Sequence, residues 1–313
     1  MRFVNLLLND VTYVLDESFD SFNKIHDLQK QLNSPDAAQM DPNAKQEKEE
    51  ALLAAQGKAK SYMNLTNETV DMLKLFTEAL ADSFTMPEIV QRLADMLDYN
   101  LDAMAGPKRL NLKIDNPQEY GFNPKQLLSA LVDVYLNLRD KESFQLAVAR
   151  DGRSYKPENF ENASAIMSRY ALKSTTDINT WNKFAATVKE VKEVDDQEEE
   201  DLGEIPDEFL DPLMYSLMSD PVILPSSKVS IDRATIRSHL LSDPNDPFNR
   251  EPLKIEQVIP NSELKEQIEN FKAEKKKEKQ VARMGHEAMD TSWGVLIEFQ
   301  LMKNVSLDSL YNS

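Results

Sequence analysis

Apolar side chains recur at intervals of three and four residues through most of the first 194 positions, and this periodicity restricts the fold more than any other feature. The stretch at residues 2–33 shows it in Val4, Leu7, Leu8, Val11, Leu15, Phe19, Phe22 and Ile25. An α-helix has about 3.6 residues per turn, so this spacing puts the apolar groups on one face that a neighbour must cover. Comparable patterns lie near 44–82, 85–106, 124–138, 143–149, 157–171 and 177–194.

Roughly seven helices with short connections, in a chain with only 7 glycines, predict an α-solenoid or an irregular helical bundle. The sequence leaves both possibilities open, because no clean internal repeat is visible. The helical pattern is already present directly after Met1. We therefore expect that the chain begins inside a larger domain and leaves apolar surface uncovered.

Capping signals predict where two of these helices begin. Thr85 and Glu88 have the spacing of a capping box, and Pro87 suits the first turn of a helix. Asn123 before Pro124 is a second start signal.

The charge balance restricts the class of partner. The chain has 54 acidic and 36 basic side chains, a formal net charge of −18. Nucleic-acid binding needs an excess of Lys and Arg to displace counterions, so a neutral or basic protein partner fits better. No signal peptide and no apolar run of membrane-spanning length is visible, so we expect a soluble intracellular protein without a membrane partner. The compartments we expect are the cytoplasm and the nucleus.

The chain has no cysteine, which excludes disulfide bonds, thiolate zinc sites and a cysteine nucleophile. Its three histidines, His26, His239 and His286, lie far apart in the sequence, which argues against a histidine-rich metal site. We therefore expect neither a metal nor another cofactor.

The composition changes at residue 195. The run "DDQEEEDLGE" is typical of a solvated linker or a frayed helix end, and we place an acidic linker at 195–204. After it, "DPVILP" and "KVSI" predict a small β-hairpin, while "RATIRSHLL" and "NSELKEQIENF" predict two helices. A module of this size, residues 205–280, has room for only a small core, so interactions other than metal binding must brace it.

Between those two helices lies "SDPNDPFNREPL", residues 242–253. Its three prolines exclude a helix and disfavour a strand, because each removes a backbone donor and restricts the preceding residue. The segment is therefore a shaped loop, and it carries one aromatic residue, Phe248, and one basic residue, Arg250.

Residues 205–271 closely resemble a U-box, in the segments "IPDEFLDPL", "LMSDPVILPS", "IDRATI", "DPFNREPL" and "IPNSELKEQI". That family is similar to a RING finger in which hydrogen bonds and salt bridges replace two zinc sites, and it recruits a ubiquitin-conjugating enzyme. Residues 1–194, opening with "FVNLLLNDVTYVLDE", resemble the end of the core domain of the fungal ubiquitin chain elongation factor family.

The resemblance implies a mainly α protein with a solenoid-like, armadillo-like helical core at 1–194 and a small α+β U-box at 205–280. The core of that family is far longer, so the chain resembles its C-terminal part. Residues 281–313 do not match a U-box ending, and we treat them as an extension of unknown role.

The resemblance also implies which residues contact the conjugating enzyme. These are Leu213 and Tyr215 on a first loop, and Pro247 and Arg250 on the proline loop. Exposed apolar groups on stiff loops lose little entropy when a partner docks. The alternative is that Leu213 and Tyr215 belong to the core, and Phe248 has the same two options.

Arg250 matches the arginine that, in this superfamily, bridges the conjugating enzyme and its ubiquitin and so promotes transfer without covalent catalysis. A planar guanidinium with five donors suits such a bridge. The alternative is a surface arginine paired with Glu251.

Five further residues are candidates for the bracing network that stands in for zinc: Asp220, Asp232, Arg233, Asp246 and Asn249. Buried polar groups of this kind must satisfy one another. Asp232 has a simpler alternative role as a helix cap.

Two functions follow from these interpretations. The first is a ubiquitin-protein ligase that elongates chains on substrates for proteasomal degradation, with a conjugating enzyme, ubiquitin, ubiquitinated substrates and a hexameric AAA segregase as partners. It would form no ubiquitin thioester of its own, because it has no cysteine. The second is a helical adaptor whose terminal module only binds partners.

Overall fold

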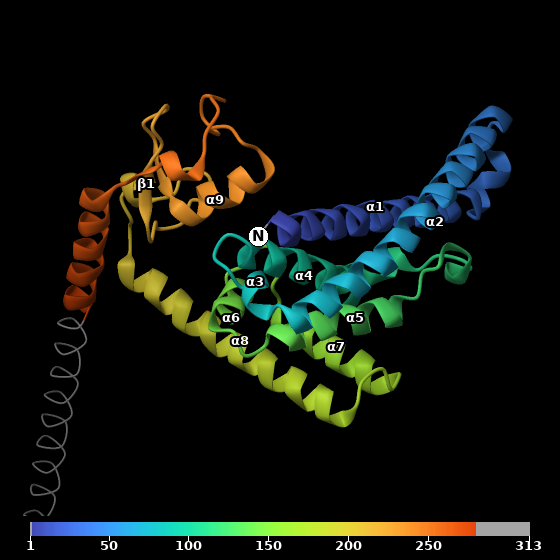
Figure 1. The fold of residues 1–313 in the computed structure, drawn as a ribbon. Coiled ribbons are helices and arrows are strands. Elements are labelled where there is room, and N and C mark those ends of the chain that lie inside the picture. The colour runs from blue at the N-terminus through green and yellow to red at the C-terminus, as the bar shows by residue number, and fades with distance from the viewer. Residues whose placement is uncertain (1, 280–313) are drawn as a thin grey trace, which may run out of the picture. The chain divides into compact units, whose positions relative to one another are not determined.

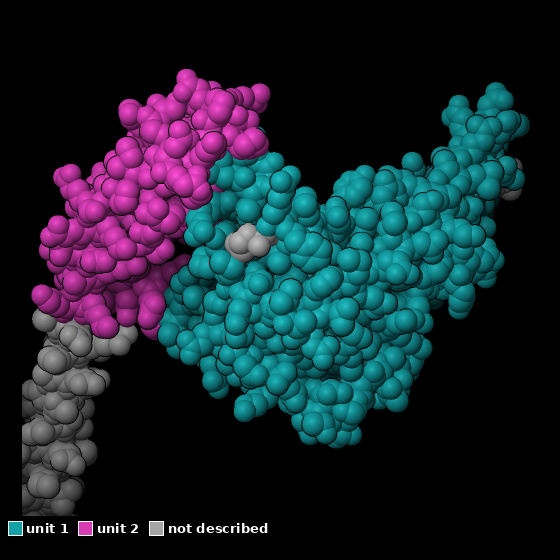
Figure 2. All heavy atoms as spheres, viewed as in Figure 1, with its two compact units in different colours: residues 1–195, 237–243 teal, residues 196–236, 244–313 magenta. Residues whose placement is uncertain are grey.

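The structure is a computed structural model that describes residues 2–279, and the extension expected at 281–313 lies outside these residues. The chain divides into two compact units (Figure 2). The first contains residues 1–195 and 237–243, and the second contains residues 196–236 and those from 244 onward.

Helices build the first unit, as the apolar periodicity predicts. They are α1 (Arg2–Leu32), α2 (Pro42–Ala79), α3 (Ala81–Phe84), α4 (Val90–Ala105), α5 (Pro124–Leu138), α6 (Glu142–Ala149), α7 (Pro157–Arg169) and α8 (Thr175–Leu202). Short 3-10 turns are η1 (Pro35–Gln39), η2 (Pro107–Leu112) and η3 (Pro117–Tyr120). No helix in the described part of the chain is long and apolar enough to cross a membrane.

The two longest helices, α1 and α2, pack side by side (Figure 1). The apolar stripe of α1 is buried there, including Leu8, Leu15 and Phe22. The hydroxyls of Ser18 and Thr66 form a hydrogen bond of 2.9 Å inside this contact. α2 also packs on α5, and α4 packs on α6 and α7, so the packing is not limited to neighbours in the sequence.

One predicted helix start is confirmed and the other is wrong. Asn123 accepts a hydrogen bond from the backbone N–H of Gln126 over 3.2 Å at the start of α5. The hydroxyl of Thr85 instead donates to the carbonyl of Ala81 over 3.1 Å, so Thr85 ends α3, and α4 begins only at Val90. A threonine hydroxyl can bond to the preceding turn, and here that bond replaces the capping box.

The acidic run is the end of α8, which continues through it to Leu202, so the structure agrees with the helix-end alternative and not with a linker over 195–204. Asp195 is buried, and both of its oxygens accept from the Arg150 guanidinium over 3.0 Å. Further along the run, Lys279 forms an ion pair of 3.2 Å with Asp201. Ion pairs with basic residues thus neutralise part of a segment whose composition alone indicates a solvated chain.

The second unit holds a small antiparallel sheet of β1 (Pro221–Ile223), β2 (Ser230–Asp232) and β3 (Ile259–Pro260), in the order β2-β1-β3. It also contains η4 (Asp207–Phe209), the start of α9 (Arg233–Ser242), η5 (Ile255–Gln257) and helical residues 262–279. The predicted hairpin is confirmed, whereas β3 has no strand signal because it has only two residues, one of them proline. The mainly α class with a small α+β module is therefore confirmed.

The core of this unit is small. Phe209, Met218, Leu264 and Ile268 form one buried cluster, against which Phe271 packs. The other buried apolar residues described in this unit are Val222, Leu224, Ile231, Ile236, Leu253 and Val258. A core of this size leaves much of the stabilisation to polar contacts.

Candidate functional site: two Asp-Pro loops on one hairpin

Two loops of the second unit have the same internal hydrogen bonds. We call residues 211–216, "DPLMYS", the first loop and residues 246–251, "DPFNRE", the second loop. In each loop, the N–H of the aspartate donates to the carbonyl of the sixth residue over 2.8 Å. The N–H of the fifth residue donates back to the aspartate carbonyl, also over 2.8 Å in both loops. The two segments are therefore two copies of one backbone motif.

The aspartate side chains close the loops from inside. One oxygen of Asp211 accepts from the N–H groups of Leu213 and Met214 over 2.9 and 3.0 Å. One oxygen of Asp246 accepts from the N–H of Phe248 over 2.9 Å. Each loop is thus held without a disulfide or a metal ligand.

The second oxygen of each aspartate attaches its loop to the β1–β2 hairpin. Asp211 accepts from the N–H of Asp232 over 2.9 Å. Asp246 accepts from the N–H and the hydroxyl of Ser227 over 3.3 and 2.7 Å. Both aspartates are buried, so these bonds satisfy carboxylates that would otherwise destabilise the fold. One hairpin therefore carries both loops.

The fifth residue of each loop has a left-handed backbone, with φ of 55° at Tyr215 and 63° at Arg250. A residue with a side chain is disfavoured there by about 1–2 kcal/mol, so the surrounding hydrogen bonds must hold the conformation. Both side chains are exposed, with 79% of Tyr215 accessible to solvent. The motif thus presents its fifth side chain to the surface.

The apolar candidates of the first loop lie on the surface. Leu213 is 43% exposed and the neighbouring Met214 is 55% exposed, so neither belongs to the core. On the second loop, Pro247 is half-buried and Phe248 is 39% exposed. The structure therefore rules out the core alternative for Leu213 and for Tyr215.

Asp232 does more than cap α9. One of its oxygens accepts from the N–H of Ala234 over 2.9 Å, as a cap does. The other accepts from the N–H and hydroxyl of Ser219 over 2.6 and 3.1 Å, and from the N–H of Asp220 over 3.0 Å. This carboxylate fixes the chain that enters β1.

Asp220 and Arg233 form an ion pair of 2.6 Å, and Lys265 contributes a second one to Asp220 at 3.3 Å. The hydrogen bond from Arg233 lowers the pKa of Asp220, and the bond from Lys265 acts in the same direction. Asp220 is partly exposed, so this pair contributes little to stability.

Asn249 lies in a closed ring of hydrogen bonds with Ser226 and Glu251. Its amide donates to the Ser226 hydroxyl over 2.5 Å, and its carbonyl oxygen accepts from the N–H of Glu251 over 3.0 Å. The hydroxyl of Ser226 in turn contacts the Glu251 carboxylate. Glu251, the alternative partner of Arg250, thus bonds to Ser226 instead. No ion pair found among the described residues involves Arg250.

The sequence interpretation missed Asp211 and Ser226. A signal existed for Asp211, because "DP" precedes Tyr215 at the same distance as a second "DP" precedes Arg250. No signal existed for Ser226, since serine in a turn such as "LPSSKV" is ordinary.

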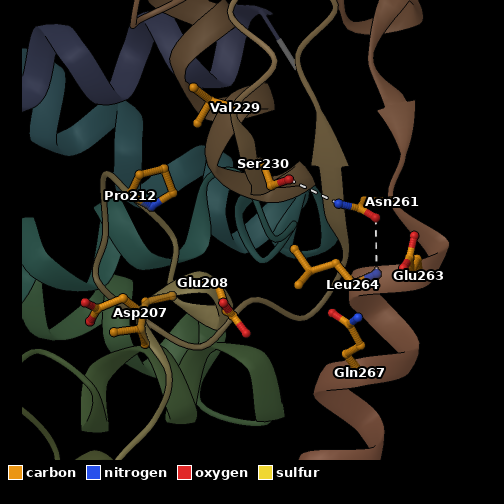
Figure 3. Close-up of a pocket in the computed structure, with 10 residues that line it drawn as sticks. Asp207, Glu208, Pro212, Val229, Ser230, Asn261, Glu263, Leu264 and Gln267 are labelled. Atoms are coloured by element: carbon orange, nitrogen blue, oxygen red, sulfur yellow. Dashed lines mark hydrogen bonds between the residues drawn. The ribbon is translucent and has the colours of Figure 1, made fainter.

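A pocket of about 420 Å³ lies beside the first loop and the hairpin, with Pro212, Val229 and Ser230 in its lining (Figure 3). Asp207, Glu208 and Glu263 contribute carboxylates to its lining, and none of the predicted site residues takes part. Asn261 donates to the Ser230 hydroxyl and accepts from the N–H of Leu264, each over 3.1 Å, as Figure 3 shows. Within residues 2–279, no group of side chains is arranged to hold a metal ion.

Comparison with known proteins agrees with this arrangement. Residues 1–189 match the family model described as ubiquitin elongating factor core, and residues 205–277 match the U-box domain. The first match covers more than half of the chain, which therefore belongs to the ubiquitin elongating factor core family and carries a U-box domain.

Three relatives show the extent of the similarity. The ubiquitin conjugation factor E4 of Schizosaccharomyces pombe is 49% identical over 271 residues, 87% of this chain and 27% of that protein. The E4 ubiquitin-protein ligase UFD2 of Saccharomyces cerevisiae is 44% identical over 282 residues, 89% of this chain and 29% of that protein. The ubiquitin conjugation factor E4 A of Rattus norvegicus is 40% identical over 280 residues, 90% of this chain and 26% of that protein. The chain spans less than a third of the length of these relatives.

Proposed function

We propose that this chain is a ubiquitin-protein ligase of the chain-elongating kind. It binds a ubiquitin-loaded conjugating enzyme through its U-box and promotes transfer to lysine on substrates or on preformed ubiquitin conjugates. The U-box match and the name of the Saccharomyces cerevisiae relative, a ubiquitin-protein ligase, support this function. No ubiquitin thioester forms on this chain, because it has no cysteine.

The observation that carries the proposal is the pair of matching loops on one hairpin. The first loop offers exposed Leu213 and Tyr215 as an apolar contact for the conjugating enzyme, and the second adds Pro247. Both loops are stiffened by hydrogen bonds, so docking costs little conformational entropy.

Arg250 acts on the loaded enzyme rather than on the free one. Its guanidinium is exposed and makes no ion pair with the described residues, so all five donors are available to a partner. By bonding both the conjugating enzyme and ubiquitin, it holds the thioester where the lysine can attack. Its contribution is positional, since arginine neither transfers a proton nor forms a bond here.

The wider setting is part of the same proposal and rests on the family resemblance alone. The further partners are ubiquitinated substrate and a hexameric AAA segregase, and the pathway is proteasomal degradation. The compartment is the cytoplasm and nucleus.

Two substitutions test the assignment in the full chain, with discharge of a loaded conjugating enzyme onto free lysine as the assay. Leu213→Ala should weaken binding of the unloaded enzyme by about 1–3 kcal/mol, because it removes an exposed apolar contact. Arg250→Ala should leave that affinity nearly unchanged and lower the discharge rate at saturating ligase by at least about tenfold. Leu53→Ala, at a leucine of α2 that is 68% exposed, is the control and should change neither value.

If both variants lose affinity while the saturated rate is preserved, Arg250 belongs only to the docking surface. The adaptor alternative requires instead that the wild-type chain does not accelerate discharge.

A further inference from the structure

Both neighbours of Arg250 in the sequence are tied to one hydroxyl. Asn249 donates its amide to the Ser226 hydroxyl over 2.5 Å, and the Glu251 carboxylate contacts the same oxygen. Ser226 lies in the turn of the β1–β2 hairpin, 23 residues before Asn249 in the sequence. A single side chain of the hairpin therefore fixes both sides of Arg250.

The donors and acceptors of this ring are fully assigned. A serine hydroxyl has one hydrogen to donate and lone pairs to accept with. The Ser226 hydroxyl donates to the Glu251 carboxylate, and its oxygen accepts from the Asn249 amide. The carbonyl oxygen of Asn249 closes the ring by accepting from the N–H of Glu251 over 3.0 Å.

The ring encloses a backbone that needs support. Arg250 has φ of 63°, a conformation that a residue with a side chain rarely adopts. The N–H of Arg250 donates to the Asp246 carbonyl over 2.8 Å, which supports this conformation from within the loop. The ring of hydrogen bonds among Ser226, Asn249 and Glu251 supports it from the hairpin. Without the ring, the bonds of Asp246 still hold the loop, but the residues on both sides of Arg250 lose the side-chain contacts that support its backbone conformation.

We propose that Ser226 is a modification site that controls Arg250: the free hydroxyl positions the arginine, and a phosphoryl group on the same oxygen releases it. This inference rests on the proposed role of Arg250 in ubiquitin transfer. A protein kinase would form the new P–O bond at Oγ with the γ-phosphoryl group of a nucleoside triphosphate. The nucleoside diphosphate leaves, and the hydroxyl proton passes to solvent.

The phosphoryl group opposes the bond of the ring that needs the hydroxyl hydrogen, the one to the Glu251 carboxylate. The modified oxygen has no hydrogen to donate, so the bond to Glu251 is lost. A charge of about −1.5 to −2 then faces the Glu251 carboxylate, and like charges at this distance repel. Ser226 is half-buried in a turn beside the exposed Lys228, so the site lies at the surface.

The test uses the full chain with phosphoserine incorporated at position 226 during synthesis, alongside Ser226→Ala and Ser226→Thr. We expect the saturated discharge rate to fall about tenfold for the phosphoserine form and about threefold for Ser226→Ala. Ser226→Thr keeps the hydroxyl and should match the wild type. Affinity for the unloaded conjugating enzyme should stay within about twofold throughout, which a merely structural defect would not allow.

The matched control is Ser230→Ala, which removes one hydrogen bond from the same hairpin, that with Asn261, and should leave both values unchanged. Arg250→Ala in the same assay separates the two proposals. If it has no effect, the proposed function of Arg250 fails. If it lowers the rate while the phosphoserine form discharges within about twofold of wild type, the Ser226 proposal alone is overturned.

Two further results bear on the inference. Equal loss of affinity and rate in the phosphoserine form overturns it, because the docking surface rather than the arginine has then changed. Thermal unfolding shows whether the phosphoserine form folds, and if it does not, the alanine and threonine variants decide. Equal rates in those two variants overturn the proposal.

Discussion

The Asp211 carboxylate is fully buried and accepts hydrogen bonds from three backbone N–H groups. Two of these donors belong to the first loop and the third belongs to Asp232 at the end of β2. A buried donor without an acceptor costs about 1–3 kcal/mol, so the site has little tolerance for substitution.

We therefore expect Asp211→Ala to lower the free energy of unfolding of the second unit by about 2–4 kcal/mol. Asp220→Ala is the matched control, since that carboxylate is 42% exposed and should cost less than about 1 kcal/mol. Urea titration of the full chain measures the loss, and hydrogen exchange of peptides from residues 205–236 assigns it to this unit. Equal losses in both variants would contradict the bracing role of Asp211.

At the residue scale, the sequence predicts the positions of residues that belong to a known motif. It does not predict residues whose role depends on one contact with a distant part of the chain. The motif placed Leu213, Tyr215 and Arg250 on loops, and the structure finds all three exposed on loops. Ser226 escaped prediction because its importance depends on a contact with Asn249, which is distant in the sequence. No local pattern records such a contact.

At the element scale, helix existence follows from periodicity, whereas helix ends depend on individual side chains. The stripe of α1 predicts its extent almost to the residue, from Arg2 to Leu32. The boundary between α3 and α4 was mispredicted because Thr85 bonds backward instead of forward. Strand β3 was missed because its pairing with β1, not its composition, makes it a strand.

One element carries a buried acid that periodicity could not predict. Asp98 lies on α4, is almost completely buried, and accepts a bond of 2.6 Å from the Tyr135 hydroxyl. Its other oxygen has no hydrogen-bond partner among the described residues. Burial raises the pKa of Asp98 well above its ordinary value, and the nearby Asp151 and Asp95 add to this effect. Burial therefore shifts Asp98 toward its protonated form relative to an exposed aspartate.

The sign of the resulting pH dependence follows from the raised pKa. The stability contributed by protonated Asp98 is fully present below the unfolded pKa of about 3.9 and is lost as pH rises through the folded pKa. Asp98→Asn keeps an oxygen for Tyr135 and cannot ionise. We expect this variant to unfold about 2–4 °C or more above wild type at pH 8, with the difference closing toward pH 4.

Calorimetric scans of both proteins across this pH range measure the effect. Asp10→Asn, which changes an exposed carboxylate on α1, should run parallel to wild type at every pH. A difference between Asp98→Asn and wild type that grows toward low pH would mean that Asp98 is ionised in the folded protein.

At the scale of the whole molecule, the non-helical connection between α8 and the U-box is shorter than the acidic composition indicates. Residues 195–202 continue α8, and the chain leaves helical conformation only at 203–206. Gly203 has φ of 66°, a conformation that suits glycine, and its Cα faces open space. The non-helical connection is therefore about four residues long rather than the ten expected from composition.

Limited digestion with a glutamate-specific protease tests whether the non-helical connection has about four residues, 203–206, or the ten residues 195–204. Glu198, Glu199 and Glu200 lie within α8, whereas Glu204 is exposed in the connection. Cleavage requires an extended backbone, and a helix must open locally before it can be cut. Within residues 195–208, we expect the first cut after Glu204, at least about tenfold faster than cuts after the glutamates in the helix. This ratio corresponds to about 1.4 kcal/mol of free energy for local opening of the helix.

Mass spectrometry of early fragments gives the order of the cuts, and Glu204→Gln should abolish the first cut without accelerating the others. Early cutting after Glu198, Glu199 or Glu200 at a similar rate would show that the acidic run is an open linker and that α8 ends before it.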